Sequence, residues 1–365
     1  ILHLRHGDEK PGGERLHAFQ YRGSMRALVN RKAGGPEVLV VEERPDLTPK
    51  AGEVRIRVKR AGLNFADISA RVGLYPDAPK FPMVMGYEVG GVVDGVGAGV
   101  TTVKDGDRVT SLCRFGGQAT MICVPATQVA KIPDAMSFDE AAALPVNYLT
   151  AYQMLFWTAP VLPGMTVLIH MAAGGVGLAA IQLCKTVPNV TMLGTSSAAK
   201  HDFLRAQGLH HPIDYRTQDY VAEVKRLTDG RGADRILDAL GGKDWERGVS
   251  ALRSGGTLFA FGWANMIAGE KRSLLHVAKE FLSMKKWSPM QLMDLNKGIV
   301  GINLGHLWHE GPLMFSHLGA LLQLFERGHV KPHVDKVFPL SKAGEAHAYV
   351  QARKNVGKVI FDVEA

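Results

Sequence analysis

The sequence has few cysteines and no long hydrophobic run. Only three of its 365 residues are cysteine, at Cys113, Cys123 and Cys184. This odd, widely spaced set provides neither a disulfide framework nor a four-cysteine zinc lobe. No apolar stretch reaches the ~18 residues of a membrane span, and none follows a basic start as in a secretory signal. We therefore expect a cytoplasmic protein.

The sequence also lacks a cluster of basic and aromatic residues of the kind that binds nucleic acid. Its formal net charge is +8, but the Lys and Arg residues are scattered along the chain. A phosphate-rich cofactor or an anionic membrane surface explains this charge more simply. We predict no nucleic-acid partner.

The hydrophobic pattern divides the chain into segments. Residues 1–24 have no regular pattern and are expected to form a disordered extension. Over residues 25–147, short Val-rich runs and Gly-containing turns predict a barrel-like, mostly antiparallel β domain. Over residues 148–304, buried strands alternate with helical runs, which indicates a Rossmann-type doubly wound parallel sheet. Residues 305–365 are expected to return to the first domain, so the predicted fold class is α/β.

A glycine-rich turn, Ala-Ala-Gly-Gly-Val-Gly at residues 172–177, follows the apolar run 166–171 and precedes the helical run 178–186. A strand that ends in such a turn can present the N-terminal amides of a helix to a pyrophosphate. The motif is one glycine short of the usual dinucleotide pattern, because Ala172 stands at its first position. Tight packing of strand and helix is the alternative explanation.

The loop after the second predicted strand contains no acid, because residues 178–200 include neither Asp nor Glu. An acid there would bind the ribose of NAD and repel the 2′-phosphate of NADP. Thr195, Ser197 and Lys200 instead provide hydroxyl donors and a positive charge. The sequence therefore favours NADPH. Asp202, two positions after Lys200, is an acid that weakens this preference, and the alternative is an ordinary loop capped by serine with a solvated lysine.

Several further motifs occur together over residues 25–362. They are Ala61-Gly62-Leu63-Asn64-Phe65-Ala66-Asp67, Met85-Gly86-Tyr87-Glu88, residues 141–152, Ile213-Asp214-Tyr215 and Asn355-Val356-Gly357-Lys358. With the glycine-rich turn, they resemble the medium-chain dehydrogenase/reductase superfamily, and in particular its zinc-independent quinone oxidoreductase branch. Residues 170–177, 194–201 and 264–272 are similar to the vesicle amine transport protein subfamily and its bacterial relatives.

This resemblance implies a GroES-like catalytic domain at residues 25–147, completed by 305–365, and a Rossmann NADP-binding domain at 148–304. Zinc enzymes of the superfamily carry Cys where Asn64 stands, His where Tyr87 stands and a further Cys near Asn147. Asn, Tyr and Val cannot replace such ligands, so we expect no metal.

Without a metal, the easier reaction is hydride donation from NADPH to an acceptor that is already electrophilic, such as a quinone or an α,β-unsaturated carbonyl compound. The resemblance implies that Asn64 and Tyr75 donate hydrogen bonds to the acceptor oxygen, and that Asn147 and Thr150 lie beside the nicotinamide. Each has a structural alternative. Asn64 could be a turn residue and Tyr75 a half-buried tyrosine of the barrel, whereas Asn147 and Thr150 could be helix-capping residues. Asp67 is also a catalytic candidate, with internal hydrogen bonding as its alternative.

The resemblance also implies a set of cofactor contacts. The expected contacts are Gly174, Gly175, Val176 and Gly177 at the pyrophosphate, Thr195, Ser197 and Lys200 at the 2′-phosphate, Tyr215 at the adenosine, and Gly241, Phe261, Gly262 and Asn355 around the nicotinamide. Tyr215 could equally be structural.

Apolar residues recur at helical spacing in residues 271–293, together with Lys279, Lys285 and Lys286. The segment could be a helix over the substrate site, a dimer edge, or a basic amphipathic surface for anionic lipid. In the family, the strand around residues 301–304 often pairs across a twofold axis, so a homodimer is expected. The predicted function is a zinc-independent NADPH-dependent quinone or enone reductase. Its main alternative is an NADPH-binding, lipid- or membrane-associated trafficking protein with little turnover.

Overall fold

The computed structural model describes residues 24–267, 269 and 272–365. The predicted disordered extension therefore lies outside the described residues, except for Ser24. That residue begins strand β1 (Ser24–Asn30), one position before the predicted start at Met25.

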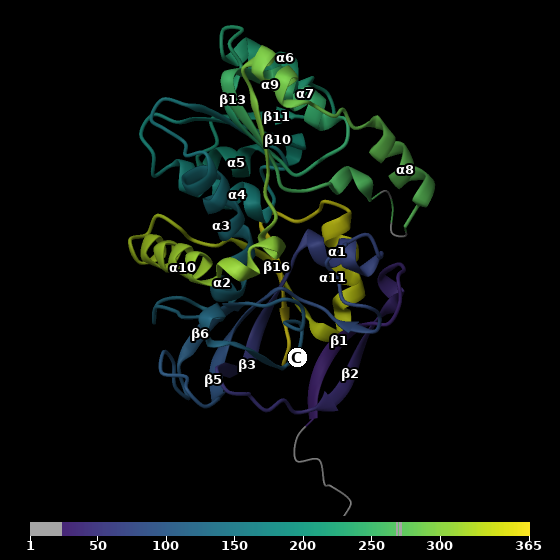
Figure 1. Ribbon diagram of the computed structural model, residues 1–365, viewed down its shortest axis with the longest axis vertical. Coiled ribbons are helices and arrows are strands. Elements are labelled where there is room, and N and C mark those ends of the chain that lie inside the picture. The colour runs from purple at the N-terminus through teal and green to yellow at the C-terminus, as the bar shows by residue number, and fades with distance from the viewer. Residues whose placement is uncertain (1–23, 268, 270–271) are drawn as a thin grey trace, which may run out of the picture.

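The described residues form three sheets in two lobes, and Figure 1 shows the parallel sheet in the upper lobe and the two mostly antiparallel sheets in the lower lobe. The lower lobe contains a seven-stranded sheet in the order β15-β16-β3-β5-β6-β8, with β7 paired to β3, and a three-stranded sheet in the order β2-β1-β4. All pairs are antiparallel except β15 with β16. The strands are β2 (Leu39–Pro45), β3 (Glu53–Leu63), β4 (Met83–Val84), β5 (Glu88–Val96), β6 (Arg108–Leu112), β7 (Met121–Pro125), β8 (Val129–Lys131), β15 (Val334–Pro339) and β16 (Lys358–Asp362).

The upper lobe contains a six-stranded sheet in the order β11-β10-β9-β12-β13-β14, and all its pairs are parallel. The strand order reverses between β9 and β12, which is where doubly wound sheets bind nucleotides. The strands are β9 (Thr166–Ile169), β10 (Thr191–Ser196), β11 (His211–Asp214), β12 (Ala233–Asp238), β13 (Leu252–Ala260) and β14 (Gly298–Gly301). The predicted Rossmann-type α/β fold with a separate GroES-like sheet domain is confirmed.

Alternate residues of the parallel strands enter two different cores. Val167 and Ile169 pack in a core with α4, whereas Leu168 packs in a core with α6 and α7. Because side chains alternate across a strand, a sheet with helices on both faces needs continuous apolar strands. The helices around this sheet are α4 (Gly175–Cys184), α5 (His201–Gln207), α6 (Tyr220–Leu227) and α7 (Asp244–Ala251).

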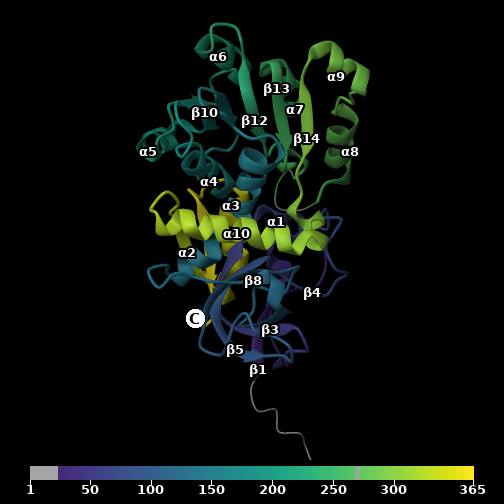
Figure 2. The ribbon, with the colours of Figure 1, turned by 60° about the vertical axis from the view of Figure 1, so that its left-hand side comes forward.

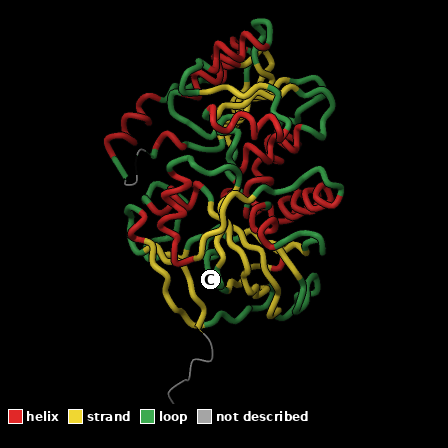
Figure 3. Tube along the Cα trace, turned by 180° about the vertical axis from the view of Figure 1, so that it is seen from behind, coloured by secondary structure: helices red, strands yellow, loops and turns green. Residues whose placement is uncertain are grey.

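The chain crosses between the lobes several times. It leaves the lower lobe through α2 (Phe138–Ala143), α3 (Pro145–Tyr152) and the π-helix η3 (Gln153–Thr158), and returns through α10 (Gly311–Glu326), which packs on α3. Figure 2 shows α10 running across the junction of the two lobes. Helix α11 (Ala343–Gln351) then precedes β16, which pairs with β3. Figure 3 shows both sheets from behind. The domain boundaries at residues 147 and 304 remain a prediction.

Residues 271–293, whose apolar side chains recur at helical spacing and whose helix is expected to end near Trp287 and Pro289, run through two helices, α8 (Leu274–Ser283) and α9 (Pro289–Leu295). The chain breaks between them because Ser288 and Gln291 form a capping box and Pro289 occupies the first turn, which starts a new helix. Lys271 lies outside the described residues.

Candidate active site

A cavity of about 870 Å³ lies where the two lobes meet, and both contribute to its wall. Asn64, Tyr75 and Tyr87 come from the lower lobe, whereas Phe261 and Gly262 follow β13 of the parallel sheet. The cavity therefore joins the carboxyl ends of the parallel strands to the residues that the sequence marks as catalytic. Ligand sites in open α/β sheets occur at this edge.

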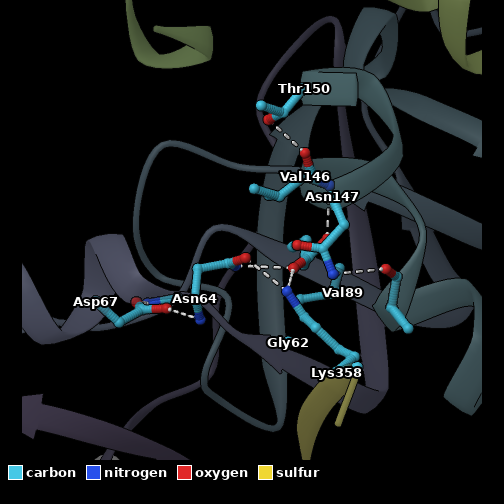
Figure 4. Close-up of polar contacts among 12 residues, drawn as sticks. Gly62, Asn64, Asp67, Val89, Val146, Asn147, Thr150 and Lys358 are labelled. Carbon is cyan, nitrogen blue, oxygen red and sulfur yellow. Dashed lines mark hydrogen bonds and ion pairs between the residues drawn. The ribbon is translucent and has the colours of Figure 1, made fainter. Parts of the chain in front are cut away.

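Asn64, which lines the cavity, forms a buried polar cluster with Glu88 and Lys358, and Figure 4 shows Asn64 and Lys358 in it. Asn64 Nδ2 donates a hydrogen bond of 2.8 Å to Glu88 Oε1, and Lys358 Nζ donates one of 2.6 Å to Asn64 Oδ1. Lys358 Nζ also forms an ion pair with Glu88 Oε1. The other carboxylate oxygen of Glu88 accepts the Val146 N–H at 2.7 Å. One N–H and the carbonyl of Asn64 are therefore committed to this cluster.

Asp67 lies in the first turn of α1 (Phe65–Arg71) and is fully buried. Its two oxygens accept the N–H groups of Asn64, at 2.8 Å, and Gly86, at 3.1 Å. Burial raises the pKa of Asp67 to about 7. The side chain does not line the cavity. The expectation of a catalytic Asp67 is therefore corrected, because these bonds make it a residue that positions Asn64.

Two tyrosines face one another on the lower wall of the cavity. The rings of Tyr75 and Tyr87 meet edge to face at 6.0 Å between centroids, and Phe115 packs on Tyr87 at 4.6 Å. Burial raises the pKa of Tyr75 to about 12 and shifts the pKa of Tyr87 upward as well, so both phenols are neutral at pH 7. The Tyr87 hydroxyl is buried and has no hydrogen-bond partner within the described part of the chain. Sequence reasoning treated Tyr87 only as a lost zinc ligand.

Thr150 and Asn147 both lie on α3 but face different neighbours. Thr150 lines the cavity, and its hydroxyl donates to the Val146 carbonyl at 2.7 Å. Asn147 does not line it: a Cβ added at Gly175 would lie 2.1 Å from Asn147 Nδ2. The Asn147 amide packs against Gly175, the first residue of α4, and the expectation that both residues lie beside the nicotinamide remains a prediction.

The glycine-rich turn is tight around the N-terminus of α4. A Cβ on Gly177 would lie 2.4 Å from the Ala172 carbonyl oxygen, so a side chain there would separate the helix from its strand. Gly174, Gly175 and Val176 keep part of their surface exposed. The first-turn N–H groups of a helix have no intrahelical acceptor, and this turn can present them to a phosphate.

The three residues expected at the 2′-phosphate have different surroundings. The Thr195 hydroxyl is buried and bonded to His170 Nδ1 at 3.1 Å and to the Met171 N–H at 3.2 Å. The Thr195 hydroxyl therefore holds residues 170 and 171, which precede the glycine-rich turn, and is not free to bind a phosphate. Its assignment to the 2′-phosphate is corrected. Ser197 is half-buried, and Lys200 Nζ donates to the carbonyls of Arg353, at 2.9 Å, and Asn355, at 2.6 Å.

Tyr215 lies after β11 and is 42% exposed, next to the loop that carries Ser197. Its N–H donates to the Ser196 carbonyl at 3.3 Å. The guanidinium of Arg216 lies 5.8 Å from the Tyr215 ring centre, and its charge contributes, after burial, to the lowered pKa of Lys200. Arg216 is thus a second cation near Lys200. Sequence reasoning missed it, although it follows the Ile213-Asp214-Tyr215 motif directly.

The remaining expected cofactor contacts surround the ends of β12 and β13. Asp238 Oδ1 accepts the Gly241 N–H at 3.0 Å, which holds the turn after β12. Phe261 and Gly262 line the cavity, whereas Gly241 does not. Asn355 Nδ2 donates to the Gly357 carbonyl at 2.8 Å, and Asn355 meets Lys200. Asn355 thus lies beside Lys200, and its assignment to the nicotinamide remains a prediction.

Within residues 24–267, 269 and 272–365, no group of three or more His, Cys, Asp or Glu side chains could hold a metal ion. At the positions of the superfamily's zinc ligands, Asn64 is bonded to Glu88 and Lys358, and the ammonium group of Lys358 already contacts the Glu88 carboxylate. This donor set does not fit a zinc ion.

Comparison with known families supports the two-lobe architecture. Residues 50–134 match the alcohol dehydrogenase GroES-like domain, and residues 207–361 match the family described as zinc-binding dehydrogenase.

Known proteins of similar length also match. The chain is 44% identical over 339 residues to the synaptic vesicle membrane protein VAT-1 homolog of Homo sapiens, which covers 92% of this chain and 86% of that protein. The crystal structure of the human VAT-1 homolog-like protein matches with a TM-score of 0.82 and 38% identity, covering 94% of this chain and 99% of that one. Escherichia coli quinone oxidoreductase, solved with NADPH, matches with a TM-score of 0.80 and 28% identity, over 92% and 99% of the two chains.

Proposed function

The chain belongs to the medium-chain dehydrogenase/reductase superfamily, and from that premise we propose that it is an NADPH-dependent reductase of quinones or α,β-unsaturated carbonyl compounds. The observation that carries this proposal is the cavity between the lobes. It brings Asn64 and Tyr75 to the same wall as Phe261 and Gly262, which follow a strand of the nucleotide-binding sheet.

The residues around the parallel sheet fit NADPH. The N–H groups of Gly175 and Val176 would bind the pyrophosphate, with Gly177 allowing the close approach of α4. The Gly174 N–H already donates to the Met171 carbonyl at 2.8 Å, so Gly174 would contribute by leaving room for the phosphate. Ser197, Lys200 and Arg216 would bind the 2′-phosphate, and Tyr215 would pack against the adenosine. The two carbonyls that accept from Lys200 hold its ammonium in place, and both Asp335 and Arg216 act on its charge.

When bound, NADPH supplies the hydride, and the protein supplies the hydrogen bonds that the reduced acceptor needs. Tyr75 lines the cavity and stays protonated at pH 7, so its hydroxyl can stabilise charge on the acceptor oxygen and then donate the proton. The second N–H of Asn64 would assist. Thr150 would orient the nicotinamide end.

We propose that this reaction needs no zinc, because Asn64 and Tyr87 stand where the zinc enzymes carry Cys and His, and Asn64 is already bonded to Glu88 and Lys358. The test is NADPH oxidation at 340 nm with ortho-quinones, para-quinones and short enones, with and without a chelator. We expect turnover that resists the chelator, and tighter binding of NADPH than of NADH. Tight NADPH binding without turnover on any acceptor would contradict the reductase proposal.

A second candidate function is supported by the surface of α8 and α9, where no residue is buried. Leu275, Leu282 and Met293 are 84%, 83% and 77% exposed, and Lys286 is exposed nearby. Exposed apolar side chains beside basic ones are typical of a peripheral contact with an anionic membrane. No helix in the described part of the chain is long and apolar enough to cross a membrane.

Flotation with vesicles that contain phosphatidylserine tests this membrane contact. Binding that is lost in a Leu275→Ser and Leu282→Ser double variant, but kept in Leu162→Ser, would support it. Leu162 is the control because it is also exposed, at 54%, but lies outside α8 and α9.

We further propose that the protein forms a homodimer through β14. This strand lies at the end of the parallel sheet, paired with β13 on one side. An edge strand can pair with its copy across a twofold axis. Light scattering should give twice the chain mass, and Ile299→Pro should reduce it to one chain by removing a ladder N–H.

A further inference from the structure

The cavity runs along one side of α3 and the π-helix η3. Val146, Thr150, Gln153 and Trp157 all line it, with spacings of four, three and four residues. Such spacings place side chains on one side of a helix. From Val146 to Trp157, this row of side chains spans roughly 15 Å at the rise of an α-helix. The cavity therefore extends along this row of side chains, and its far end is the part beside Gln153 and Trp157.

The opposite wall of the far end comes from the start of α10. Leu313, Met314 and Leu318 line the cavity there, and a contact of 3.3 Å between Gln153 Nε2 and Met314 Sδ joins the two walls. We call the part lined by Gln153, Trp157, Leu313, Met314 and Leu318 the α10 arm. Its wall is almost wholly apolar.

The α10 arm has an exposed outer end. Trp157, in the arm, and Phe315, beside it on α10, line the cavity and are 56% and 43% exposed. A long ligand could thus extend from the lobe junction to the surface, with its last atoms in contact with these two rings.

Among residues 24–267, 269 and 272–365, the lining of the cavity contains no Lys or Arg. Besides the phenols of Tyr75 and Tyr87 and the thiol of Cys113, its chargeable side chains are Asp77 and His306, which pair with one another at 2.8 Å. An acceptor with phosphate or carboxylate groups would lose its hydration without gaining a cation. The cavity therefore suits a neutral molecule.

We propose that the acceptor is a neutral quinone with an apolar isoprenoid or alkyl tail, its ring beside Tyr75 and its tail in the α10 arm. This inference rests on the proposed reductase function and narrows its substrate class. The quinone takes up a hydride from NADPH and one proton, delivered by Tyr75 and replaced from solvent. The products are the hydroquinone and NADP⁺. The tail does not react. It lowers the free energy of binding because its apolar surface is transferred from water into the α10 arm.

The test compares quinones that share one ring and carry zero, one or two isoprenoid units. Because each unit buries further apolar surface, we expect kcat/KM to rise about 10-fold per unit. In Leu313→Trp, which fills the arm, the ratio of kcat/KM for the two-unit quinone to that for the tail-less quinone should fall at least 10-fold. In the control Gln323→Trp, on α10 but outside the cavity lining, this ratio should stay as in the wild type.

Equal kcat/KM for all three quinones, or an unchanged ratio in Leu313→Trp, would overturn the inference while leaving the reductase proposal intact. If no quinone is reduced, the reductase proposal fails, and the same series is then titrated by quenching of tryptophan fluorescence. Affinity that rises with tail length and falls in Leu313→Trp would still assign the arm to an apolar tail. Affinity independent of tail length would exclude it.

Discussion

At the scale of single residues, Lys200 has neighbours that its position in the chain does not reveal. The acid-free loop predicts a phosphate site, but the carbonyls that hold the Lys200 ammonium belong to Arg353 and Asn355, more than 150 residues away. Arg216 adds a second positive charge beside it. Both cations can bind the 2′-phosphate that distinguishes NADPH from NADH.

We predict that Lys200→Ala raises the Kd of NADPH by about 10-fold to 100-fold, which is the strength of a charged hydrogen bond. The Kd of NADH should change much less, because NADH lacks the phosphate. Fluorescence titration of both cofactors measures this, with the exposed Lys104→Ala as control. An equal loss for both cofactors would show that Lys200 only holds the 353–355 loop.

Tyr75→Phe should lower kcat by about 10² while leaving the Kd of NADPH unchanged, because it removes one donated proton and no cofactor contact. The matched control is Tyr349→Phe, whose hydroxyl donates to Asp335 at 2.9 Å outside the cavity lining. Steady-state kinetics with one quinone and a direct NADPH titration are sufficient. An unaltered kcat would remove Tyr75 from the proton path and leave Tyr87 as the candidate phenol.

His170 gives a pH-dependent prediction, since burial lowers its pKa to about 4 from the usual 6.5. The native state disfavours the protonated ring, so its contribution to stability is present above pH 6.5 and is lost as the pH falls towards 4. Compared with His170→Asn, which cannot titrate, the wild type should lose up to about 3 kcal/mol over this range. Urea unfolding at several pH values measures the difference. A constant difference between the two proteins would contradict it, and the exposed His329→Asn is the control.

At the scale of elements, the approach of α4 to β9 decides whether the nucleotide site forms. The sequence predicts the strand, the turn and the helix. It also predicts that Gly177 allows the helix to lie close to the turn, and the Ala172 carbonyl oxygen leaves no room for a side chain there. The sequence does not predict that Asn147, on α3, fills the space beside Gly175. The reason is that helix packing depends on side-chain shapes from two distant segments, which a local pattern does not contain.

Gly177→Val should weaken NADPH binding at least 100-fold, because its Cβ would lie 2.4 Å from the Ala172 carbonyl oxygen. The control is Gly319→Val on α10, where a Cβ meets nothing within 4 Å. Circular dichroism must show that both variants are folded before the titration. Unchanged affinity in folded Gly177→Val would place the pyrophosphate elsewhere.

At the scale of the whole molecule, the last strand, β16, joins the lower sheet by pairing with β3. Lys358 at the start of β16 pairs with Glu88 at the start of β5, 270 residues away in sequence. The same cluster holds Asn64 at the cavity and Val146 at the start of α3. A single buried ion pair thus connects the lower sheet to the active-site wall.

Lys358→Met should lower the free energy of unfolding by about 3–5 kcal/mol, because it leaves the buried Glu88 carboxylate without its cation. Adding Glu88→Gln should recover part of this loss, since the uncompensated charge is then gone. Thermal unfolding of the single and double variants tests both statements, with the exposed pair member Lys342→Met as control. A double variant no more stable than Lys358→Met would contradict the account.

The sequence by itself determined the two kinds of sheet, the glycine-rich turn and the acid-free loop. These features are local, because they depend on hydrophobic periodicity and on residues that are neighbours in the chain. The same locality explains the errors: Thr195 and Asp67 have suitable chemistry, but burial and internal hydrogen bonds use it for structure.

Only the tertiary structure decided the partners of Lys200, the Asn64–Glu88–Lys358 cluster and the length and neutrality of the cavity. Each depends on segments separated by a hundred residues or more, whose side chains meet after the two lobes have packed together. Apolar burial drives that packing without regard to sequence separation. Which polar groups then face one another, and which space stays empty, follows from the three-dimensional arrangement alone.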